Sequence, residues 1–236
     1  MGLLLLERGY PVDDFIFFDL GVEHPETYEA IAKFEQDTGR KVAVVKPPLG
    51  DFWYYSCEHE YIGKHKKAGI AMKGYGFPVF NARWCTKKKQ DAINAYNKSK
   101  GYSKNNCIQY VGIAYDEPKR LHDYPDKRYP LAEWGITEAD ALKFCRDRGY
   151  FKSPHPYDYN NRVSCFCCPF TNNAQIEYLI EHRPELWQVI KDHEVSPEIT
   201  GNQRFQWKLK GTAYFEERLR KKRQAENQQM KMEFDK

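Results

Sequence analysis

Three of the seven cysteines lie within four consecutive residues, as Cys165, Cys167 and Cys168. Cys165 and Cys168 form a C-x-x-C, a spacing that lets two thiolates reach one metal ion from a single turn. Cys85 lies 80 residues before Cys165 and is a fourth candidate ligand, since a distant cysteine completes such a site when the chain folds back. Metal or iron–sulfur ligation is therefore the leading interpretation of this spacing. A redox pair and ordinary buried thiols are the alternatives.

A second candidate site follows an apolar run near the start of the chain. Residues 15–18 are continuously apolar, which predicts a strand covered on both faces. In open α/β sheets, ligands bind beyond the carboxyl ends of the strands. The residues after this strand are therefore a candidate binding edge, and they are Asp19, Leu20 and Gly21.

A charged segment also follows residues 107–113, which predict another strand. Arg120 lies in this segment and is a candidate contact for a phosphate or sulfate, because a planar guanidinium bonds two anionic oxygens at once. The alternative for Arg120 is an ion pair on the surface.

The elements around these sites alternate between strand and helix. Pro25 opens an apolar pattern that Gly39 ends, which predicts a helix, and residues 41–45 predict a second buried strand. Such a strand–helix–strand predicts a βαβ unit with parallel strands. Further helices are predicted at residues 86–100, 138–148 and 172–194, the last interrupted by Pro184.

The predicted fold class is therefore α/β, with an open, mostly parallel sheet flanked by helices and a largely helical C-terminal part that contains the cysteines. We assign residues 1–125 to the α/β core, 126–200 to the helical cysteine region and 201–236 to a basic tail. Residues 50–82 read as a long irregular segment, and such segments are usually functional or mobile.

The bulk composition limits the class of protein. The 236 residues are 41% hydrophobic and 30% charged, which is typical of a globular protein rather than a disordered one. The early apolar run, residues 3–6, is too short for a signal peptide or a membrane span. An odd number of cysteines without a secretion signal indicates the reducing cytoplasm and argues against a disulfide scaffold. The net charge of +4 permits an anionic ligand.

The segment 204–223 is basic and carries interleaved aromatic residues. Such a stripe is typical of nucleic-acid binding, although a solvated amphipathic tail is the more frequent explanation. Nucleic acid is therefore kept as a candidate partner of the tail.

Five ordered segments carry a resemblance to a known family. They are Asp19-Leu20-Gly21-Val22-Glu23-His24-Pro25-Glu26-Thr27-Tyr28, Arg83-Trp84-Cys85-Thr86, Gly112-Ile113 with Asp116-Glu117 and Arg120, Tyr129-Pro130-Leu131 with Trp134, and Ser164-Cys165-Phe166-Cys167-Cys168-Pro169. They resemble the motifs of phosphoadenosine phosphosulfate (PAPS) reductase-like proteins, which belong to the PP-loop adenine-nucleotide superfamily. The resemblance covers about residues 3–195 and is nearest to the versions found in phages and mobile elements.

The resemblance implies an adenine nucleotide alpha hydrolase-like fold that binds ATP or PAPS. Asp19, Leu20 and Gly21 would border the adenosine, and Arg120 would contact the anionic end. The cysteines would hold a [4Fe–4S] cluster, with zinc as the alternative, and these ligands would be Cys85, Cys165, Cys167 and Cys168. The implied reaction is sulfonucleotide reduction, sulfur transfer or adenylation, with a thioredoxin-like protein as electron donor in the first case.

Two departures from the family pattern bear on activity. The S-G-G-x-D-S phosphate loop of the family is not found in this sequence, so we expect the chain to be a shortened form of a longer protein. No cysteine follows Cys168, so the nucleophilic cysteine near the C-terminus of PAPS reductases has no counterpart, and no catalytic residue is assigned. The alternative function is a non-catalytic, metal-stabilised module that binds nucleic acid or protein.

Overall fold

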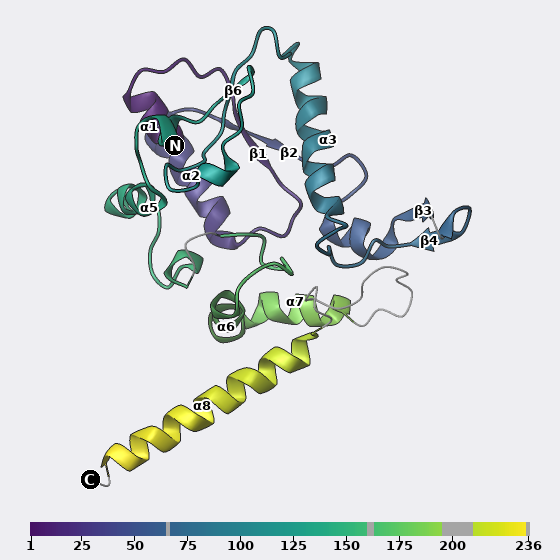
Figure 1. Ribbon diagram of the computed structural model, residues 1–236, viewed down its shortest axis with the longest axis vertical. Coiled ribbons are helices and arrows are strands. Elements are labelled where there is room, and N and C mark those ends of the chain that lie inside the picture. Colours follow the sequence, from purple (N-terminus) through teal and green to yellow (C-terminus); the bar gives the residue numbers. More distant parts are fainter. Residues whose placement is uncertain (65–66, 160–162, 195–209, 235–236) are drawn as a thin grey trace. The chain divides into compact units, whose positions relative to one another are not determined.

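The computed structural model describes residues 1–64, 67–159, 163–194 and 210–234 (Figure 1). The chain folds into two compact units, and neither is one continuous stretch of sequence. Unit 1 comprises Met1–Pro48 and Lys87–Val163, and unit 2 comprises Leu49–Thr86 and Ser164–Lys236. Each unit is described by itself below.

Unit 1 contains the first strand–helix–strand of the chain. Its elements are α1 (Gly2–Glu7), β1 (Phe15–Phe18), α2 (Pro25–Thr38), β2 (Val42–Val45), most of α3 (Trp84–Ser99), β5 (Gln109–Tyr110), the 3-10 turn η3 (Pro118–Arg120), β6 (Lys127–Arg128), α4 (Pro130–Glu133), α5 (Glu138–Asp147) and the 3-10 turn η4 (Pro156–Asp158).

The helices of unit 1 begin and end where local sequence signals place them. Pro25 occupies the first turn of α2, and Gly39 ends the helix in the left-handed conformation, with φ of 68°. Thr137 caps α5 by a reciprocal pair of hydrogen bonds with Asp140. The predicted helices at both places are confirmed.

Strands β1 and β2 pair in parallel, in register from Phe15 with Val42 to Phe18 with Val45. The predicted βαβ unit is confirmed to this extent, with α2 as its connecting helix. The carboxyl ends of both strands therefore meet at one edge, which is where Asp19 follows β1.

The structure does not contain the extended parallel sheet that the sequence predicted. Within the described residues, the strands form three separate two-stranded sheets, β1–β2, β3–β4 and β5–β6. The predicted strand over residues 107–113 is reduced to Gln109 and Tyr110. It pairs with β6, which follows shortly after it in the chain, and not with β1. The predicted open-sheet α/β fold is therefore wrong, and helices make up most of the regular structure.

A sheet of two strands also leaves apolar side chains in contact with solvent. Ile16 in β1 is 37% exposed and Val44 in β2 is 52% exposed. The prediction that residues 15–18 form a strand covered on both faces is therefore wrong. Continuous apolar character cannot tell a strand between two layers from a strand in a small one-sided sheet.

Unit 2 contains a short hairpin and three helices. Its elements are the π-helical turn η1 (Tyr54–Glu58), the antiparallel strands β3 (Glu60–Ile62) and β4 (Ala71–Lys73), the start of α3, and the helices α6 (Asn173–His182), α7 (Pro184–Glu194) and α8 (Thr212–Phe234). The predicted interruption at Pro184 is confirmed, because Pro184 is the first residue of α7.

The described residues of the segment 50–82 contain more regular structure than the sequence indicated. It packs aromatic rings around the fully buried Tyr55, including Tyr75 and Trp84. Gly74 follows β4, and an added Cβ would lie only 2.3 Å from the carbonyl oxygen of Ser56 in η1. Only glycine permits this close approach, and it also has φ of 64° there. This small aromatic core positions Cys85, which follows Trp84.

Candidate functional site

Asp19 fastens the loop between β1 and α2 in unit 1. Its backbone N–H donates to the carbonyl of Val45 (2.9 Å), which extends the pairing of β1 and β2 by one residue. Its side chain is only 6% exposed. One carboxylate oxygen, Oδ1, accepts hydrogen bonds from the Gly21 N–H (2.6 Å) and from the Tyr28 hydroxyl (2.8 Å).

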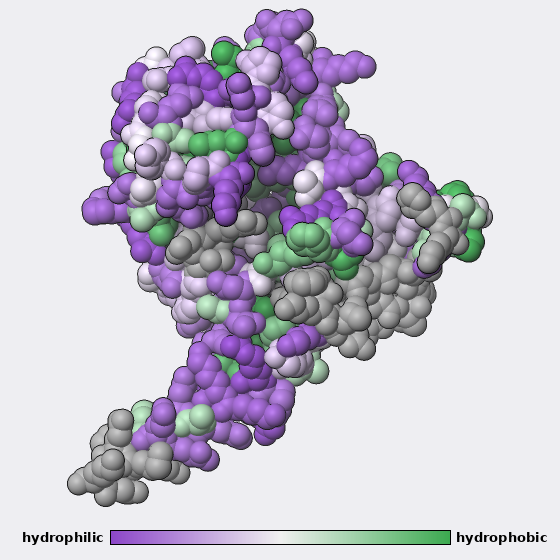
Figure 2. Space-filling view, viewed as in Figure 1, coloured by the Kyte–Doolittle hydropathy of each residue, from purple (hydrophilic) through white to green (hydrophobic). Residues whose placement is uncertain are grey.

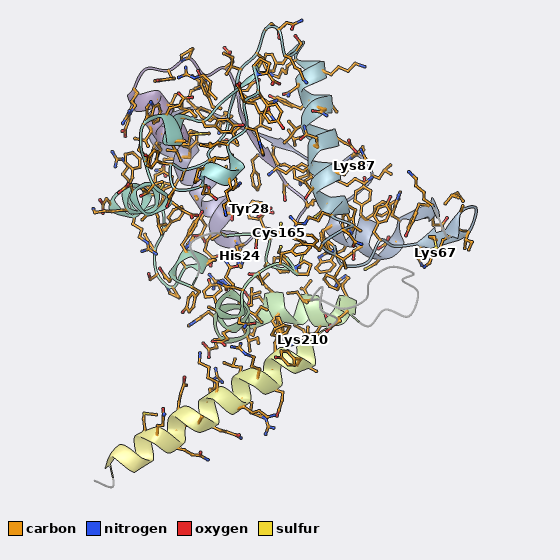
Figure 3. The ribbon with its side chains drawn as sticks, in the orientation of Figure 1. His24, Tyr28, Lys67, Lys87, Cys165 and Lys210 are labelled. Carbon is orange, nitrogen blue, oxygen red and sulfur yellow. The ribbon has the colours of Figure 1, made fainter. Side chains whose placement is uncertain are left out.

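The second carboxylate oxygen of Asp19 lies 3.7 Å from the Nζ atom of Lys46, an exposed side chain. Tyr28 lies one turn into α2, close to His24 at the start of that helix (Figure 3). Burial raises the pKa of Tyr28, and its hydrogen bond to Asp19 raises it further. Tyr28 therefore stays protonated and donates. The Asp19 carboxylate is thus engaged with protein groups, and it shapes the loop.

The backbone of residues 20 and 21 is the part of this loop that is suited to a ligand. Leu20 buries its side chain in the core. Gly21 has φ of 77°, a left-handed conformation that other residues rarely adopt, and it carries no side chain to block an approaching group. The structure therefore places the three predicted residues together, in different roles.

Arg120 ends η3, the turn that follows the segment after β5. Its guanidinium pairs with the carboxylate of Glu117, three residues earlier, and its side chain is exposed. Glu117 also accepts a hydrogen bond from the Ala114 N–H (3.4 Å). This geometry matches the surface ion pair that was the alternative for Arg120. Recruitment of Arg120 to an anion would require it to leave Glu117.

The cysteine cluster in unit 2 forms a tight turn. The Cys168 N–H donates to the Cys165 carbonyl (3.0 Å), and the Thr171 N–H donates to the Cys168 carbonyl (3.2 Å). Cys165 and Cys168 are partly exposed, whereas Cys167 is completely buried. The turn therefore presents the C-x-x-C pair (Cys165 is labelled in Figure 3) and points Cys167 into the core.

Cys85 lies in the first turn of α3, next to this cysteine turn. The guanidinium of Arg83 covers the ring of Phe170 at 4.5 Å, which joins the two segments, and the Trp84 indole N–H donates to the Gly76 carbonyl (3.0 Å). Burial raises the pKa of the Cys85 thiol, and the negative charge of a nearby Cys168 thiolate raises it further. Cys85 and Cys168 are thus near enough for the charge of one thiolate to affect the other.

The complete four-cysteine set is not gathered. Among the residues that the structure describes, no three His, Cys, Asp or Glu side chains are close enough together to hold a metal ion. The donor chemistry suits zinc or an iron–sulfur cluster, because thiolates are their common ligands. In position, Cys85 lies within electrostatic range of Cys168, and Cys165 lies on the same turn as Cys168.

Several buried ionisable residues of unit 1, among them Glu26 and His155, were not singled out as site residues by the sequence analysis. Glu26 lies in the first turn of α2 and is 7% exposed, and His155 precedes η4 and is 4% exposed. Glu26 lies in the segment 19–28 that carries part of the family resemblance, and His155 lies in a segment rich in proline and tyrosine. Their burial depends on the tertiary fold, so residue type and spacing gave no signal for it.

The basic tail lies partly in α8, while residues 201–209 are outside the described part of the chain. Three cations of α8 pair with acids of α6: Arg218 and Lys222 with Glu177, and Arg223 with Glu181. Arg220 and Lys221 pair with Glu217 on α8 itself. These ion pairs account for five of the cations of α8.

Comparisons with known proteins find distant relatives. A Methanocaldococcus jannaschii protein named "Uncharacterized protein MJ0973" is 25% identical over 187 residues, which is 75% of this chain and 40% of that protein. A protein of Escherichia phage lambda named "Uncharacterized nin region protein ORF290" is 25% identical over 160 residues, which is 64% of this chain and 55% of that protein. The chain thus spans about half the length of these relatives.

No family model matches the sequence, and no solved structure matches it. In the described part of the chain, every helix is too short or too polar to cross a lipid bilayer.

Proposed function

We propose that this protein is a PAPS reductase-like protein that binds an adenine nucleotide at the loop between β1 and α2 and holds a metal centre through Cys85, Cys165 and Cys168. The observation that carries this proposal is the placement of Cys85 beside Cys168 in unit 2. The five segments that resemble the family supply the nucleotide and the reaction class, which is sulfonucleotide reduction, sulfur transfer or adenylation.

Unit 1 supplies the groups that would bind the nucleotide. Asp19 fixes the loop through Gly21, Tyr28 and Lys46, so the backbone of residues 20 and 21 is held in one conformation. A preformed loop loses little conformational entropy when it binds a ligand. Arg120 would exchange Glu117 for the anionic end of the nucleotide, since a guanidinium binds phosphate or sulfate at two oxygens.

Unit 2 supplies the metal ligands. Cys85, Cys165 and Cys168 would bind as thiolates, and Cys167 is buried on the other side of the turn, which makes it the least suited of the four predicted ligands. A zinc ion would stabilise the fold, and an iron–sulfur cluster would add electrostatic or redox chemistry. A reducing cytoplasmic compartment would keep these thiols available as ligands.

The first test measures iron, acid-labile sulfide and zinc in protein purified without oxygen. We expect about one metal centre per chain in the wild type, and loss of most of it in Cys85→Ser and in Cys168→Ser. Cys57→Ser is the matched control, because Cys57 lies in unit 2 within η1 and is expected to leave the metal content unchanged. Absence of metal, or equal metal in all four proteins, contradicts the metal centre.

The second test measures the affinity for ATP and PAPS by calorimetry. Asp19→Ala frees the loop after β1 and is expected to weaken binding about tenfold. Asp37→Ala removes an exposed carboxylate at the other end of α2 and is the control. A protein that holds metal but binds neither nucleotide would instead be the non-catalytic, metal-stabilised module.

A further inference from the structure

Unit 1 contains a polar cavity of about 350 Å³ at the C-terminal end of α3. The last turns of α3 line one part of it, residues 101–104 a second part, and Cys107, Gln109 and Asp126 a third. Its lining includes neither Arg120 nor residues 19–21, so it is separate from the proposed nucleotide loop. The volume lies within the range of pockets that bind small organic molecules.

Asp126 places a buried carboxylate at this cavity. The residue directly precedes β6 and is only 9% exposed. Its backbone carbonyl accepts a hydrogen bond from the Gln109 N–H (2.8 Å), which holds it beside β5. In the described part of the chain, no group donates a hydrogen bond to its carboxylate and no cation forms an ion pair with it. Such a carboxylate has lost most of its water and is a strong acceptor for the donors of a ligand.

The thiol of Cys107 does not offset the charge of Asp126. Burial raises the pKa of Cys107, and the negative charges of Asp13 and Asp126 raise it further. The thiol is therefore neutral at pH 7 and is only a weak donor.

The side chains next to Asp126 suit a planar polar ligand. Asn97 and Gln109 are half-buried, and among the described residues neither side-chain amide makes a hydrogen bond with another protein group. Each amide can donate and accept, as the edge of a nucleobase requires. The hydroxyl of Tyr102 donates to Asp14 (2.9 Å), which fixes an aromatic ring at the wall. A base can stack on such a ring.

Two cations lie at the outer part of the cavity. Lys98 and Lys104 line it and are exposed, and within the described residues neither forms an ion pair with an acid. An ammonium group is a common ligand of phosphate. The cavity therefore offers a strong acceptor at its buried wall and positive charge at its exposed wall.

We infer that this cavity binds a guanine nucleotide, with the base at Asp126 and the phosphate at Lys98 and Lys104. Guanine carries two adjacent donors, N1–H and the 2-amino group, which match the two oxygens of one carboxylate. Hypoxanthine has only the N1–H donor, and adenine presents an acceptor at N1, which a carboxylate repels. The inference is independent of the proposed adenine-nucleotide loop and metal centre.

The test compares GMP, IMP and AMP by calorimetry with the full chain. GMP is expected to bind at least about tenfold more tightly than IMP or AMP. Asp126→Asn keeps the size of the side chain and is expected to remove this preference while thermal unfolding stays cooperative. Asp123→Asn, at an exposed acid of the same loop outside the cavity, is the matched control and is expected to keep it.

A second pair of variants tests the phosphate end. GMP is expected to bind about fivefold more tightly than guanosine, and Lys98→Ala combined with Lys104→Ala is expected to abolish this difference. Both side chains are exposed, so their loss leaves the fold intact. Lys89→Ala, at an exposed lysine of α3 outside the cavity, is the control.

The same titrations in Asp19→Ala separate this cavity from the proposed adenine-nucleotide loop, because the preference for GMP is expected to persist there. Four outcomes overturn the inference: no binding of GMP, equal binding of GMP, IMP and AMP, an unchanged preference in folded Asp126→Asn, or loss of the preference in Asp19→Ala.

Discussion

His155 combines a buried imidazole with a capping role in unit 1. It is the N-cap of η4, where its Nδ1 accepts from the Tyr157 N–H. Burial lowers the pKa of His155 below the usual 6.5, and the charge of Arg146 lowers it further. The nearby carboxylates of Glu26, Asp158 and Glu29 raise this pKa, but burial has the larger effect. The folded protein therefore binds a proton at His155 less readily than the unfolded chain does.

This difference predicts a dependence of stability on pH. Above about pH 7 His155 is neutral in both states and contributes nothing. As the pH falls through about 6.5, the unfolded chain takes up the proton first, so the free energy of unfolding decreases by at most about 1.4 kcal/mol per pH unit. Urea unfolding at pH 7.5, 6.5 and 5.5 measures this decrease in the free energy of unfolding.

His155→Asn should flatten this decrease, because asparagine keeps a capping acceptor but does not titrate. His122→Asn, at an exposed histidine of the same unit, serves as the control and should behave as the wild type. Equal slopes in the wild type and His155→Asn would show that another group causes the pH dependence.

At the scale of elements, α8 depends on a carboxylate from the helix before it. Glu194 at the end of α7 accepts hydrogen bonds from the Thr212 N–H (2.8 and 3.1 Å, one to each carboxylate oxygen) and from the Thr212 hydroxyl (2.5 Å). The first turn of α8 then buries Phe215 and, one turn later, Leu219. Residues 220–230 are exposed, and Figure 2 shows a mostly hydrophilic surface along α8.

Glu194→Ala should therefore loosen the start of α8. Loss of a buried, charged acceptor leaves the Thr212 donors unsatisfied, which costs about 1–3 kcal/mol in the free energy of unfolding. Hydrogen exchange should accelerate over residues 212–219 in particular. Glu185→Ala, at an exposed position of α7, is the control. Unchanged exchange at 212–219 would mean that apolar packing alone holds the helix.

The elements also show what the sequence could and could not predict. Helix α2 was predictable because Pro25 and Gly39 are local signals for its two ends. The parallel pairing of β1 and β2 was predictable because only a short stretch of chain, one helix, connects them. The pairing of β5 with β6 was not predictable, because apolar character says nothing about which partner a strand chooses. Hairpin β3–β4 was missed because its three-residue strands are too short to show alternation.

The same distinction applies to the candidate sites. A common site for Cys85 and the local C-x-x-C was a hypothesis from residue type and spacing, and the structure places Cys85 within electrostatic range of Cys168. A surface ion pair of Arg120 was foreseen only as an alternative, without its partner Glu117. Glu26 and His155 both line a cavity of unit 1 whose walls come from segments far apart in the sequence, so no local pattern marks it.

At the scale of the whole molecule, the chain passes between the two units three times, at residues 48–49, 86–87 and 163–164. The proposed nucleotide loop belongs entirely to unit 1, and the cysteine turn with Cys85 belongs entirely to unit 2. Each proposed ligand should therefore stabilise its own unit first, because a ligand stabilises the state that binds it by mass action.

Hydrogen exchange of the full chain, read by mass spectrometry, tests this division. ATP should slow exchange over residues 15–28 and leave residues 164–171 nearly unchanged, while metal removal should speed exchange over residues 83–86 and 164–171 and spare 15–28. Cys85→Ser should mimic metal removal and still respond to ATP. If metal removal instead loosens both units equally, the cysteine turn supports the whole molecule, and the metal then acts on the nucleotide loop through the three chain crossings. The two proposed sites would in that case be thermodynamically coupled. Loss of metal would then lower the affinity for ATP by some factor, and loss of ATP would lower the affinity for metal by the same factor.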